Sequence, residues 1–443
     1  MAGPSGGARG VNAAPLKIAV AGLGTVGAGV VKLLAQHRDL IAKRCGRPIV
    51  VVAASARDRA KNRGTDLSAI EWYDDAATMA AKASVDVVVE LIGGAEGIAR
   101  NVCETAIASG RHVVTANKAL LAHHGTALAR AAEAKNVALA YEAAVAGGIP
   151  IIKALREGMA GNRLSRVYGI LNGTCNYILT AMRKSGRPFD EVLAEAQSLG
   201  YAEADPSFDV DGIDAAHKLA ILASVAFGCE VNFGGVHVEG IRRVSPMDIR
   251  FAEELGYRIK LLGIAKLTES GVEQRVHPCM VPIAAPIASI DGVFNAVVAD
   301  GDYVDTIMQE GRGAGQGPTA SAVVADLVDI ARQRWIPAFG VPAADLVRLP
   351  ASPMDRHVGA YYIRLMVVDR PGVFADVAAA LRDHDVSMEG ILQRTRQPGE
   401  PVPVVLTTHE TTEAAMAGTL KRIQGLGAVV EPPCMIRIEA FAP

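Results

Sequence analysis

The sequence has few aromatic residues, little net charge and no long apolar run. Phe, Trp and Tyr make up 5% of the 443 residues, which argues against an aromatic-rich binding surface. Lysine and arginine nearly balance the acidic residues, at 45 against 47, so the composition favours neither a nucleic acid nor a membrane surface as partner. No apolar run reaches the ~18–20 residues that a membrane-spanning helix needs. These scarcities together argue against a nucleic-acid-binding protein, a membrane-spanning protein and an aromatic-rich binding surface.

The six cysteines are widely spaced and form no CxxC pair. This spacing does not match a set of zinc ligands, and a disulfide framework is not expected in so long and apolar a chain. Residues 1–15 are rich in Gly, Ala and Pro but lack the apolar segment of a signal peptide, so we expect a disordered tail there. These features predict buried free thiols and a cytoplasmic location.

Half of the residues are apolar and 21% are charged, which is typical of a chain that folds around a core. At roughly 150 residues per domain, the length suggests about three domains. Between residues 16 and 150, near-continuous apolar segments alternate with alanine-rich helical segments. This pattern is typical of a parallel sheet covered on both faces. We therefore predict an α/β domain of the doubly wound Rossmann type at residues 16–150.

The rest of the chain shows two other patterns. Residues 151–336 combine amphipathic helices with weaker strands near 257–267, 276–283 and 293–300, which favours an α+β domain with an antiparallel sheet. Residues 337–358 contain four prolines and are predicted to be a linker. Residues 359–443 have the order strand, helix, strand, strand, helix, strand, which predicts a ferredoxin-like βαββαβ domain.

Three glycines lie between the first predicted strand and the first predicted helix. Gly22-Leu23-Gly24-Thr25-Val26-Gly27 has the GxGxxG spacing of a dinucleotide-binding loop. In such a loop the first glycine permits a tight turn, the second lets the pyrophosphate approach the backbone, and the third allows close helix–sheet packing. The helix N-terminus then offers free N–H groups to the phosphates. The loop predicts a bound dinucleotide, with a purely structural turn as the alternative.

The end of the second predicted strand bears on which nicotinamide cofactor binds. It carries Ser55-Ala56-Arg57, and further basic residues follow. NAD-specific sites usually place Asp or Glu there to bind the ribose 2′-hydroxyl. The guanidinium of Arg57 instead suits the 2′-phosphate of NADP. The sequence therefore favours NADP as the cofactor. Two alternatives remain: the protein uses NAD as well, or the basic loop is solvated and binds no phosphate.

Carboxylates gather ahead of one lysine in residues 200–218. Asp214 and Lys218 are spaced i and i+4 at the start of a predicted helix, so they share one face. The residues that follow are apolar on almost every side, which is typical of a buried helix. A substrate with an ammonium group needs such carboxylates, and proton transfer needs such a lysine. The alternative is an ordinary Asp–Lys helix pair, worth ~0.3–0.5 kcal/mol.

Several motifs, in this order along the chain, resemble those of homoserine dehydrogenases. They are the glycine loop at 22–27, Ala116-Asn117-Lys118-Ala119, the segment 141–150 (Tyr-Glu-Ala-Ala-Val-Ala-Gly-Gly-Ile-Pro), Leu171-Asn172-Gly173-Thr174, and the run from Ala196 to Lys218. The resemblance covers residues 16 to about 335, and residues 359–443 resemble an ACT regulatory domain. No aspartokinase-like segment precedes the first strand in this sequence, so we expect the monofunctional form of the enzyme.

The resemblance implies NAD(P)-dependent interconversion of L-aspartate 4-semialdehyde and L-homoserine, on the route to threonine, methionine and isoleucine. It implies that Lys218 is the general acid and base, and that Lys118 is a second catalytic lysine near the nicotinamide. The implied substrate-binding residues are Gly200, Glu203 and Asp214. The implied cofactor contacts are Gly22, Gly24, Thr25, Val26, Gly27, Arg57, Lys118 and Gly315. Residues 151–336 would form the catalytic and dimerisation domain, with their last helix returning to the Rossmann domain.

The resemblance also implies a structural monovalent cation, sodium or a similar ion. The matching positions, which supply backbone oxygens in the family, are Glu142, Val145, Gly147 and Ile149. A loop rich in carbonyl groups suits a hard cation, although a plain glycine-rich turn would have the same sequence.

The C-terminal domain carries a candidate effector site. Asp369 and Gly372 lie where its first strand meets its first helix, and backbone N–H groups at a helix N-terminus bind carboxylates. Gln393, on the next predicted strand, is placed to bond a hydroxyl or amino group. We predict threonine as the effector and, because ACT domains pair side by side, a homodimer or homotetramer. The alternative is a domain that serves only oligomerisation.

Two other functions remain open from the sequence. One is a non-catalytic sensor of cofactor or amino-acid levels, and the other is a dehydrogenase of a related amino-acid semialdehyde. A sensor needs no proton donor beside a nicotinamide, so Lys218 with Glu203 and Asp214 favours an enzyme.

Overall fold

A computed structural model of the protein describes residues 13–394 and 397–441. The predicted tail at 1–15 therefore lies mostly outside the described residues. The chain divides into two compact units. The first unit comprises the described residues up to Leu164 together with Ala220–Phe233 and Asp300–Arg348, and the second comprises Ser165–Leu219, Gly234–Ala299 and the residues from Leu349 onward.

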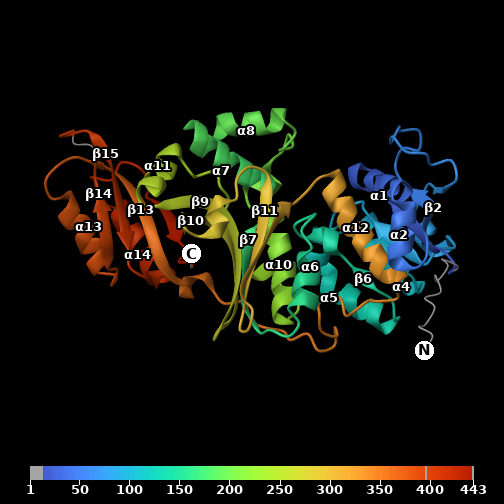
Figure 1. Ribbon diagram of the computed structural model, residues 1–443. Helices are drawn as coiled ribbons and strands as arrows, with labels where there is room; N and C mark the ends of the chain where they lie inside the picture. The colour runs from blue at the N-terminus through green and yellow to red at the C-terminus, as the bar shows by residue number, and fades with distance from the viewer. Residues whose placement is uncertain (1–12, 395–396, 442–443) are drawn as a thin grey trace, which may run out of the picture. The chain divides into compact units, whose positions relative to one another are not determined.

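The first unit contains a six-stranded sheet with the strand order β3-β2-β1-β4-β5-β6. Figure 1 labels two of these strands, β2 and β6. All of its strand pairs are parallel. Its strands are β1 (Leu16–Ala21), β2 (Ile49–Ser55), β3 (Glu71–Tyr73), β4 (Val87–Glu90), β5 (His112–Thr115) and β6 (Leu139–Ala140). The strand order reverses between β1 and β4, and open α/β sheets bind ligands at such a reversal.

Two groups of helices flank this sheet. One group consists of α1 (Thr25–Gln36), α2 (Arg38–Cys45) and α12 (Gln316–Ala331), which pack on one another. The other consists of α3 (Ala76–Lys82), α4 (Ile98–Ala108) and α5 (Lys118–Ala134). The core between sheet and helices is built of fully buried aliphatic side chains such as Ile18, Val30 and Leu327. The predicted doubly wound α/β fold is confirmed. Smaller elements of this unit are η1 (Glu142–Ala144), α6 (Ile151–Lys153), η2 (Ala154–Gly158) and β12 (Asp305–Arg312).

The second unit contains a long sheet in which the strands follow the order β11-β7-β9-β10-β17-β13-β15-β14. The first four are β11 (Phe294–Gly301), β7 (Leu164–Ile170), β9 (Tyr257–Thr268) and β10 (Gly271–Pro282). The β7–β9 and β9–β10 pairs are antiparallel, as the sequence predicts for this region. Short strand β8 (Val236–Val238) pairs with β10. The helices of this part are α7 (Gly173–Ser185), α8 (Phe189–Ser198), α9 (Ser207–Val210) and α11 (Pro246–Glu254), with the 3-10 turns η3 (Phe233–Gly235) and η4 (Pro286–Ser289). Helix α10 (Ile213–Phe227) belongs to the second unit up to Leu219 and to the first unit from Ala220 onward.

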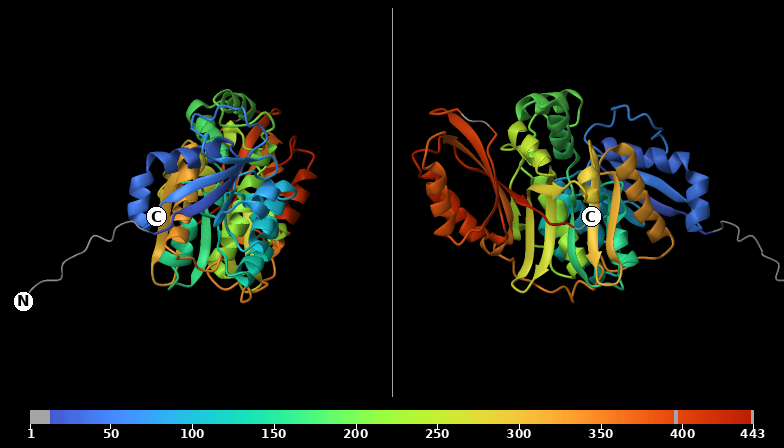
Figure 2. Two further views of the ribbon diagram at one scale, coloured as in Figure 1. Left: turned by 90° about the vertical axis from the view of Figure 1, so that its right-hand side faces the viewer. Right: turned by 60° about the vertical axis from the view of Figure 1, so that its left-hand side comes forward.

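The remaining strands of the second unit belong to the predicted βαββαβ domain. Its elements are β13 (Val358–Val368), α13 (Val373–Arg382), β14 (Met388–Leu392), β15 (Pro401–Thr408), α14 (Glu413–Gln424) and β17 (Cys434–Ile438), with a short strand β16 (Thr411–Thr412). Helices α13 and α14 pack on each other and cover one face of these strands (Figure 2). The predicted ferredoxin-like order is confirmed. Strand β17 also pairs in parallel with β10, so the strands of this domain continue the sheet that contains β9 and β10.

The predicted linker at 337–358 is irregular but packed. Ala338 and Phe339 are buried, and the Tyr141 hydroxyl donates to the Ala338 carbonyl over 2.6 Å. At its other end the Val272 N–H donates to the Pro350 carbonyl over 2.9 Å, ahead of the turn η5 (Met354–Arg356). Each end of this segment is therefore fixed to the unit to which it belongs.

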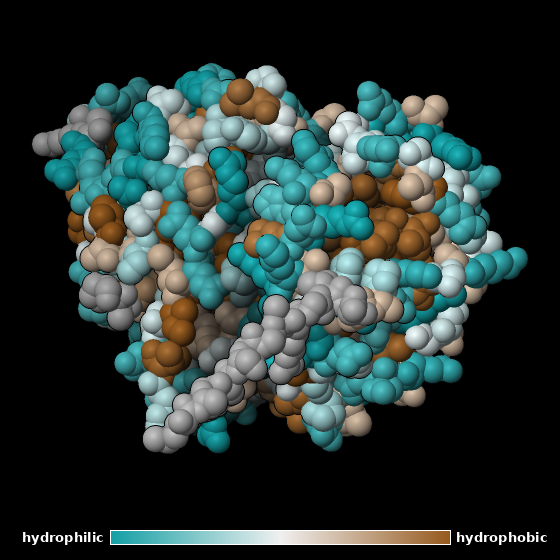
Figure 3. All heavy atoms as spheres, turned by 45° about the vertical axis from the view of Figure 1, so that its right-hand side comes forward, coloured by the Kyte–Doolittle hydropathy of each residue, from teal (hydrophilic) through white to brown (hydrophobic). Residues whose placement is uncertain are grey.

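The surface and the cysteines agree with the composition. The face seen in Figure 3 is mainly hydrophilic, with apolar side chains in separate patches. Among the described residues no helix is long and apolar enough to cross a membrane. All six cysteines are free thiols, five of them buried and Cys434 half-buried, which confirms the predicted free thiols.

Candidate active site

Lys218 and Asp214 form a buried ion pair at the start of α10. The Lys218 Nζ donates to Asp214 Oδ2 over 2.6 Å and to the Leu171 carbonyl oxygen over 2.7 Å. The two residues are only 8% and 4% exposed. An ammonium group has three N–H donors. Within the described residues the third N–H of Lys218 makes no hydrogen bond, which leaves it to donate a proton to a bound molecule.

One acceptor of this lysine, the Leu171 carbonyl, lies at the junction between β7 and α7. Asn172 is buried there and caps α7, because its Oδ1 accepts from the Cys175 N–H over 2.8 Å. Its Nδ2 donates to Asp209 Oδ1 over 2.8 Å and to Asp214 Oδ2 over 2.9 Å. Burial, followed by the nearby charge of Asp214, raises the pKa of Asp209. The sequence identified the Leu-Asn-Gly-Thr motif only as a resemblance and gave Asn172 no role.

The predicted substrate residues Gly200 and Glu203 lie on the loop between α8 and α9. Gly200 has a φ of +74°, which only glycine adopts without strain, and it turns the chain at the end of α8. The Thr174 hydroxyl donates to the Tyr201 carbonyl over 2.7 Å, which ties this loop to the start of α7. The side chain of Glu203 is exposed, and its backbone carbonyl accepts from Gln197 Nε2 over 2.9 Å. The contacts that hold the Lys218 ammonium therefore include Asp214 but not Glu203.

The glycine loop of the first unit has the geometry of a dinucleotide-binding turn. Gly22 has a φ of +99°, and a Cβ there would lie 2.6 Å from the Leu91 carbonyl oxygen. A Cβ at Gly27 would lie 2.0 Å from the Gly22 oxygen, so α1 and the strand end pack too closely for alanine. At Gly24, by contrast, a Cβ would meet no heavy atom within 4 Å. Thr25 and Val26 then begin α1 beside this open space, so the residues present fit a pyrophosphate at the helix N-terminus.

Gly315 lies next to this loop. It precedes α12 with a φ of +113°. The following residue, Gln316, donates through Nε2 to the Thr25 carbonyl over 3.0 Å. A Cβ at Gly29 of α1 would lie 2.6 Å from Gln316 Cγ, so the two helices are in close contact. The structure thus brings Gly315 and the glycine loop together, and Gln316 is a positioning residue that sequence patterns did not single out.

The basic loop after β2 is organised by Arg63. Its Nε donates to the Leu23 carbonyl in the glycine loop over 2.9 Å, and its other nitrogens donate to the Lys61 and Asp58 carbonyls. Arg57 is exposed directly after β2 and makes no hydrogen bond or ion pair within the described residues. Its guanidinium is therefore available to a ligand at the end of the strand next to β1.

Lys118 is the first residue of α5 and is half-buried. The preceding residue, Asn117, caps this helix by accepting from the Leu120 N–H over 3.0 Å, and its Nδ2 donates to the Gly94 carbonyl over 2.7 Å. Beside it, the Thr115 hydroxyl donates to the buried carboxylate of Glu90 over 2.6 Å. These contacts fix Lys118 at the carboxyl ends of β4 and β5, the edge at which such sheets bind cofactors.

The candidate cation loop at 142–149 is buried except at Gly148, and two consecutive residues have positive φ, Ala146 at 54° and Gly147 at 51°. Within the described residues no N–H donates to the carbonyl oxygens of Val145 or Gly147. Buried carbonyl groups of this kind fit a hard monovalent cation. The Gly148 N–H donates to the Arg312 carbonyl over 3.0 Å, so this loop also supports the segment that leads to Gly315.

The side chain of Glu142 has a different use. Its two carboxylate oxygens accept from the Ile152 and Lys153 N–H groups, each over 2.9 Å, at the start of α6. Burial, and next the charge of Asp326, raises the pKa of Glu142 to about 7. Asp326, on α12, accepts from the Glu142 N–H over 2.8 Å. A cation would therefore meet the backbone oxygen of Glu142, as the resemblance implies.

Two of the predicted effector residues, Asp369 and Gly372, lie at the turn between β13 and α13. Gly372 precedes α13 with a φ of +93°. The Asp369 carboxylate accepts from the Gln397 N–H over 2.8 Å, which joins this turn to the residues before β15. Gln393 directly follows β14, which ends at Leu392, rather than lying within the strand as the sequence pattern predicts. The pairing of β14 with β15 ends at Leu392, opposite Val405.

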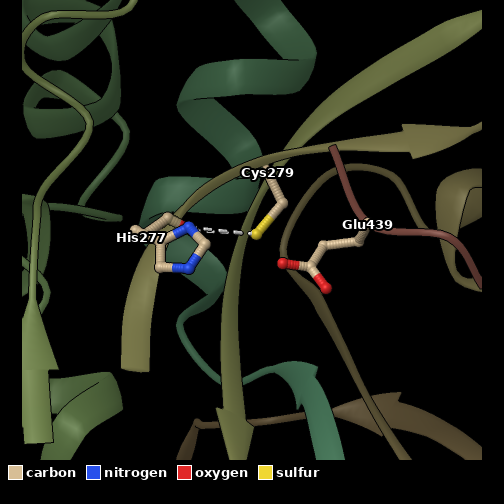
Figure 4. Close-up of side chains that lie close together, drawn as sticks. All are labelled: His277, Cys279 and Glu439. Carbon is tan, nitrogen blue, oxygen red and sulfur yellow. Dashed lines mark hydrogen bonds between the residues drawn. The ribbon is translucent and has the colours of Figure 1, made fainter. Parts of the chain in front are cut away.

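A second cluster of polar side chains lies between β10 and the end of β17. His277, Cys279 and Glu439 bring possible metal ligands within 4.8 Å of one another (Figure 4). Arg275 occupies this cluster, since its Nη1 lies 2.8 Å from His277 Nε2 and its Nη2 lies 3.2 Å from Glu439 Oε2. Burial raises the pKa of the Cys279 thiol, whereas a metal needs the thiolate. The cluster therefore suits a buried ion-pair network and not a cation.

Comparisons with known proteins agree with this geometry. Residues 22–142 match the NAD-binding domain of homoserine dehydrogenase, residues 150–328 match the homoserine dehydrogenase family, and residues 361–428 match the ACT domain. The homoserine dehydrogenase of Pseudomonas aeruginosa is 46% identical over 96% of this chain and 99% of its own length. That of Neisseria gonorrhoeae is 44% identical with the same coverage. A crystal structure of a homoserine dehydrogenase from Thiobacillus denitrificans superposes with a TM-score of 0.91 at 46% identity, covering 96% of this chain and 98% of the other.

Identity at this level over nearly the whole of both chains supports homoserine dehydrogenase function and does not favour a non-catalytic sensor or a dehydrogenase of another semialdehyde. A nicotinamide cofactor and a small-molecule substrate follow from the same matches. The chain belongs to the homoserine dehydrogenase family, as an NAD(P)-dependent oxidoreductase that acts on a CH–OH group and carries an ACT domain.

Proposed function

We propose that Lys218 is the proton donor with which this enzyme reduces L-aspartate 4-semialdehyde to L-homoserine. The observation that carries the proposal is the Lys218 ammonium itself, which is buried, held by two acceptors and left with one N–H. The nicotinamide, when bound, supplies the hydride that reduces the aldehyde carbon. Negative charge then develops on the aldehyde oxygen, and the Lys218 N–H neutralises it and transfers a proton to it. In the reverse direction the neutral amine accepts the proton of the homoserine hydroxyl.

The carboxylates around this lysine bind the amino group of the substrate. Asp214 and the exposed Glu203 are assigned to the ammonium group or to its water shell, and the turn at Gly200 places that loop. Lys118 is assigned as the second lysine near the nicotinamide, at the carboxyl end of the parallel sheet. When these carboxylates bind the ammonium group of the substrate, directly or through water, the aldehyde end of the substrate can face Lys218.

The first unit is assigned to the cofactor, with NADP preferred. Gly22, Gly24, Thr25, Val26 and Gly27 hold the pyrophosphate, Gly315 contributes a backbone contact, and Arg57 binds the 2′-phosphate. Sodium or a similar cation is assigned to the backbone oxygens of Glu142, Val145, Gly147 and Ile149. Bound there, it would stabilise the loop that supports the Arg312–Gly315 segment.

The ACT domain is assigned to feedback regulation by threonine. The carboxylate of threonine would bind at the N-terminus of α13 beside Gly372. The hydroxyl and amino groups of threonine would form hydrogen bonds with Asp369 and Gln393. Domains of this class pair side by side, so the assembly is a homodimer or homotetramer. The reaction is placed in the cytoplasm, in keeping with six free thiols.

The activity is tested with the full-length enzyme by following NADPH consumption. Aspartate semialdehyde should support turnover far better than glutamate semialdehyde or succinate semialdehyde, because only the first has both the ammonium group and the chain length for which the site is assigned. Equal rates with all three aldehydes would contradict the substrate assignment.

Regulation is tested in the same assay. Threonine at millimolar concentrations, on the order of typical metabolite affinities, should inhibit the wild type, and Asp369→Ala and Gln393→Ala should weaken the inhibition while leaving uninhibited turnover unchanged. A wild type that ignores threonine would refute the effector while leaving the dehydrogenase activity standing.

A further inference from the structure

The amide group of Asn172 has a fixed orientation in the second unit. Its Oδ1 accepts from the Cys175 N–H over 2.8 Å and so satisfies the N-terminus of α7. With the oxygen committed to this cap, the NH₂ group must face the other way, toward α9 and α10. There its two N–H donors meet two different carboxylates, Asp209 at 2.8 Å and Asp214 at 2.9 Å.

The cap alone does not account for an asparagine at this position. Ser, Thr and Asp cap helices about as well, since each offers an oxygen to the backbone N–H groups. Among these residues only asparagine also supplies two N–H donors on the opposite side. The site uses both donors, so the feature specific to asparagine is directed at the carboxylates and not at the helix.

The two carboxylates need a shared donor because they are buried together. Asp214 is 4% exposed and Asp209 is half-buried, and the two are acceptors of the same amide nitrogen. Burial and the charge of Asp214 raise the pKa of Asp209, while the hydrogen bond from Asn172 lowers it. Removing that bond would favour proton uptake by this pair, because like charges in a buried site disfavour two ionised carboxylates.

Asn172 and its neighbour also place the lysine. The Leu171 carbonyl accepts from Lys218 Nζ over 2.7 Å, and Asp214 Oδ2 accepts from both Lys218 Nζ and Asn172 Nδ2. The ammonium therefore lies between two acceptors that residues 171 and 172 fix in space. A protonated or displaced Asp214 would release one of them.

We propose that Asn172 is a positioning residue for the reaction, whose amide NH₂ group keeps Asp209 and Asp214 ionised and thereby holds the Lys218 ammonium in its donating position. This rests on the proposed role of Lys218 as proton donor. Asn172 acts through its two carboxylate partners and needs no contact with the substrate.

Two variants separate this role from helix capping. Asn172→Ser keeps an oxygen for the cap but removes the amide donors, and Asn172→Asp keeps the shape and the cap but replaces the donors with a third carboxylate. As a matched control, Asp75→Asn exchanges the same two residue types at the cap of α3 in the first unit, where Asp75 accepts from the Thr78 N–H over 2.7 Å.

The measurements are kcat for aspartate semialdehyde reduction as a function of pH, KM for NADPH, and the melting temperature. We expect Asn172→Ser to lower kcat at least tenfold at neutral pH and to move the acidic limb of its pH profile upward by about one unit, in line with the loss of a charge-assisted hydrogen bond. Asn172→Asp should lower kcat further than Asn172→Ser, because the added carboxylate repels the carboxylates of Asp209 and Asp214. KM for NADPH should stay within about twofold, and Asp75→Asn should leave the pH profile unchanged.

The proposal is overturned if Asn172→Ser keeps the wild-type kcat and acidic limb, or if it loses the same factor at every pH. The first result would make Asn172 a cap alone, and the second would indicate general misfolding of the site. Wild-type enzyme that fails to reduce aspartate semialdehyde would refute the proposed function instead, so the two failures are distinguishable.

Discussion

Replacing Lys218 with methionine is the most direct test of the chemistry. Methionine has a similar length but no N–H, so Lys218→Met removes the proposed proton donor from a position that is only 8% exposed. Water has little access there to take over the role. General acid catalysis contributes ~10²–10⁴-fold, so we expect kcat to fall at least ~100-fold. The glycine loop belongs to the other unit, so binding of NADPH should persist.

The same change should also destabilise the protein, and this effect must be separated from catalysis. Removing one partner of a buried ion pair costs about 3–5 kcal/mol, and Asn172 still donates to Asp214, so the lower end of that range is expected. Adding Asp214→Asn to Lys218→Met removes the uncompensated charge and should restore much of the melting temperature without restoring kcat. Arg100→Met is the control, because Arg100 pairs with Glu104 at i and i+4 on an exposed helix surface.

The assay should isolate the chemical step. Single-turnover oxidation of NADPH with saturating aspartate semialdehyde reports hydride transfer even where product release limits kcat. Thermal unfolding measured under the same buffer conditions reports the stability change. A Lys218→Met enzyme that keeps its single-turnover rate within tenfold of the wild type would refute the reasoning. Lys218 would then be an ordinary helix-pair lysine, and Lys118 would become the candidate donor.

Three further predictions concern other parts of the chain. Arg57→Ala should raise KM for NADPH about tenfold and leave KM for NADH nearly unchanged, since a charge-assisted contact contributes roughly 1.5–3 kcal/mol and exposure weakens it. Lys61→Ala is the control. An equal rise in KM for both cofactors would contradict the role of Arg57 in binding the 2′-phosphate. Because burial raises the pKa of Glu142 from 4.5 to about 7, the folded protein should lose stability as pH rises through that window. Glu142→Gln should flatten this part of the curve of melting temperature against pH, and an unchanged slope would contradict the assignment. Arg437→Met should lower the free energy of unfolding by about 3 kcal/mol, because Glu413 and Glu239 lose a buried guanidinium but keep their contacts with Tyr361 and His237, whereas Arg422→Met at an exposed pair should change it little.

Local patterns were sufficient to predict much of this protein. The glycine spacing at 22–27 fixes a turn and a helix start within six residues, and the i, i+4 spacing places Asp214 and Lys218 on one face of α10. Such features depend on backbone geometry over one or two turns, which a single sequence specifies well. The apolar segments of the Rossmann sheet and the βαββαβ order of the ACT domain are predictable for the same reason.

The contacts that complete the site are long-range and were not predictable in this way. Asn172 lies 42 positions from Asp214 and 37 from Asp209, and nothing in its own surroundings distinguishes a capping asparagine from one that also binds two carboxylates. Gln316 reaches Thr25 across 291 positions. Periodicity indicates which face of an element is buried, but it does not indicate which distant side chain will face it.

The pairing of β17 with β10 shows the same limit and changes how regulation must be tested. The proline-rich residues 337–358 suggest that the ACT domain could be removed by truncation. However, β17 of that domain pairs with Cys279 and Met280 of β10. Beyond it, Glu439 pairs with the buried Arg275 on β10. Deleting the ACT domain would therefore uncover a strand edge and leave a buried guanidinium without one of its carboxylates, at a cost of several kcal/mol. Loss of threonine inhibition in such a truncated chain would not distinguish a missing effector site from a damaged sheet at β9 and β10, whereas point changes at Asp369 and Gln393 in the intact chain make that distinction.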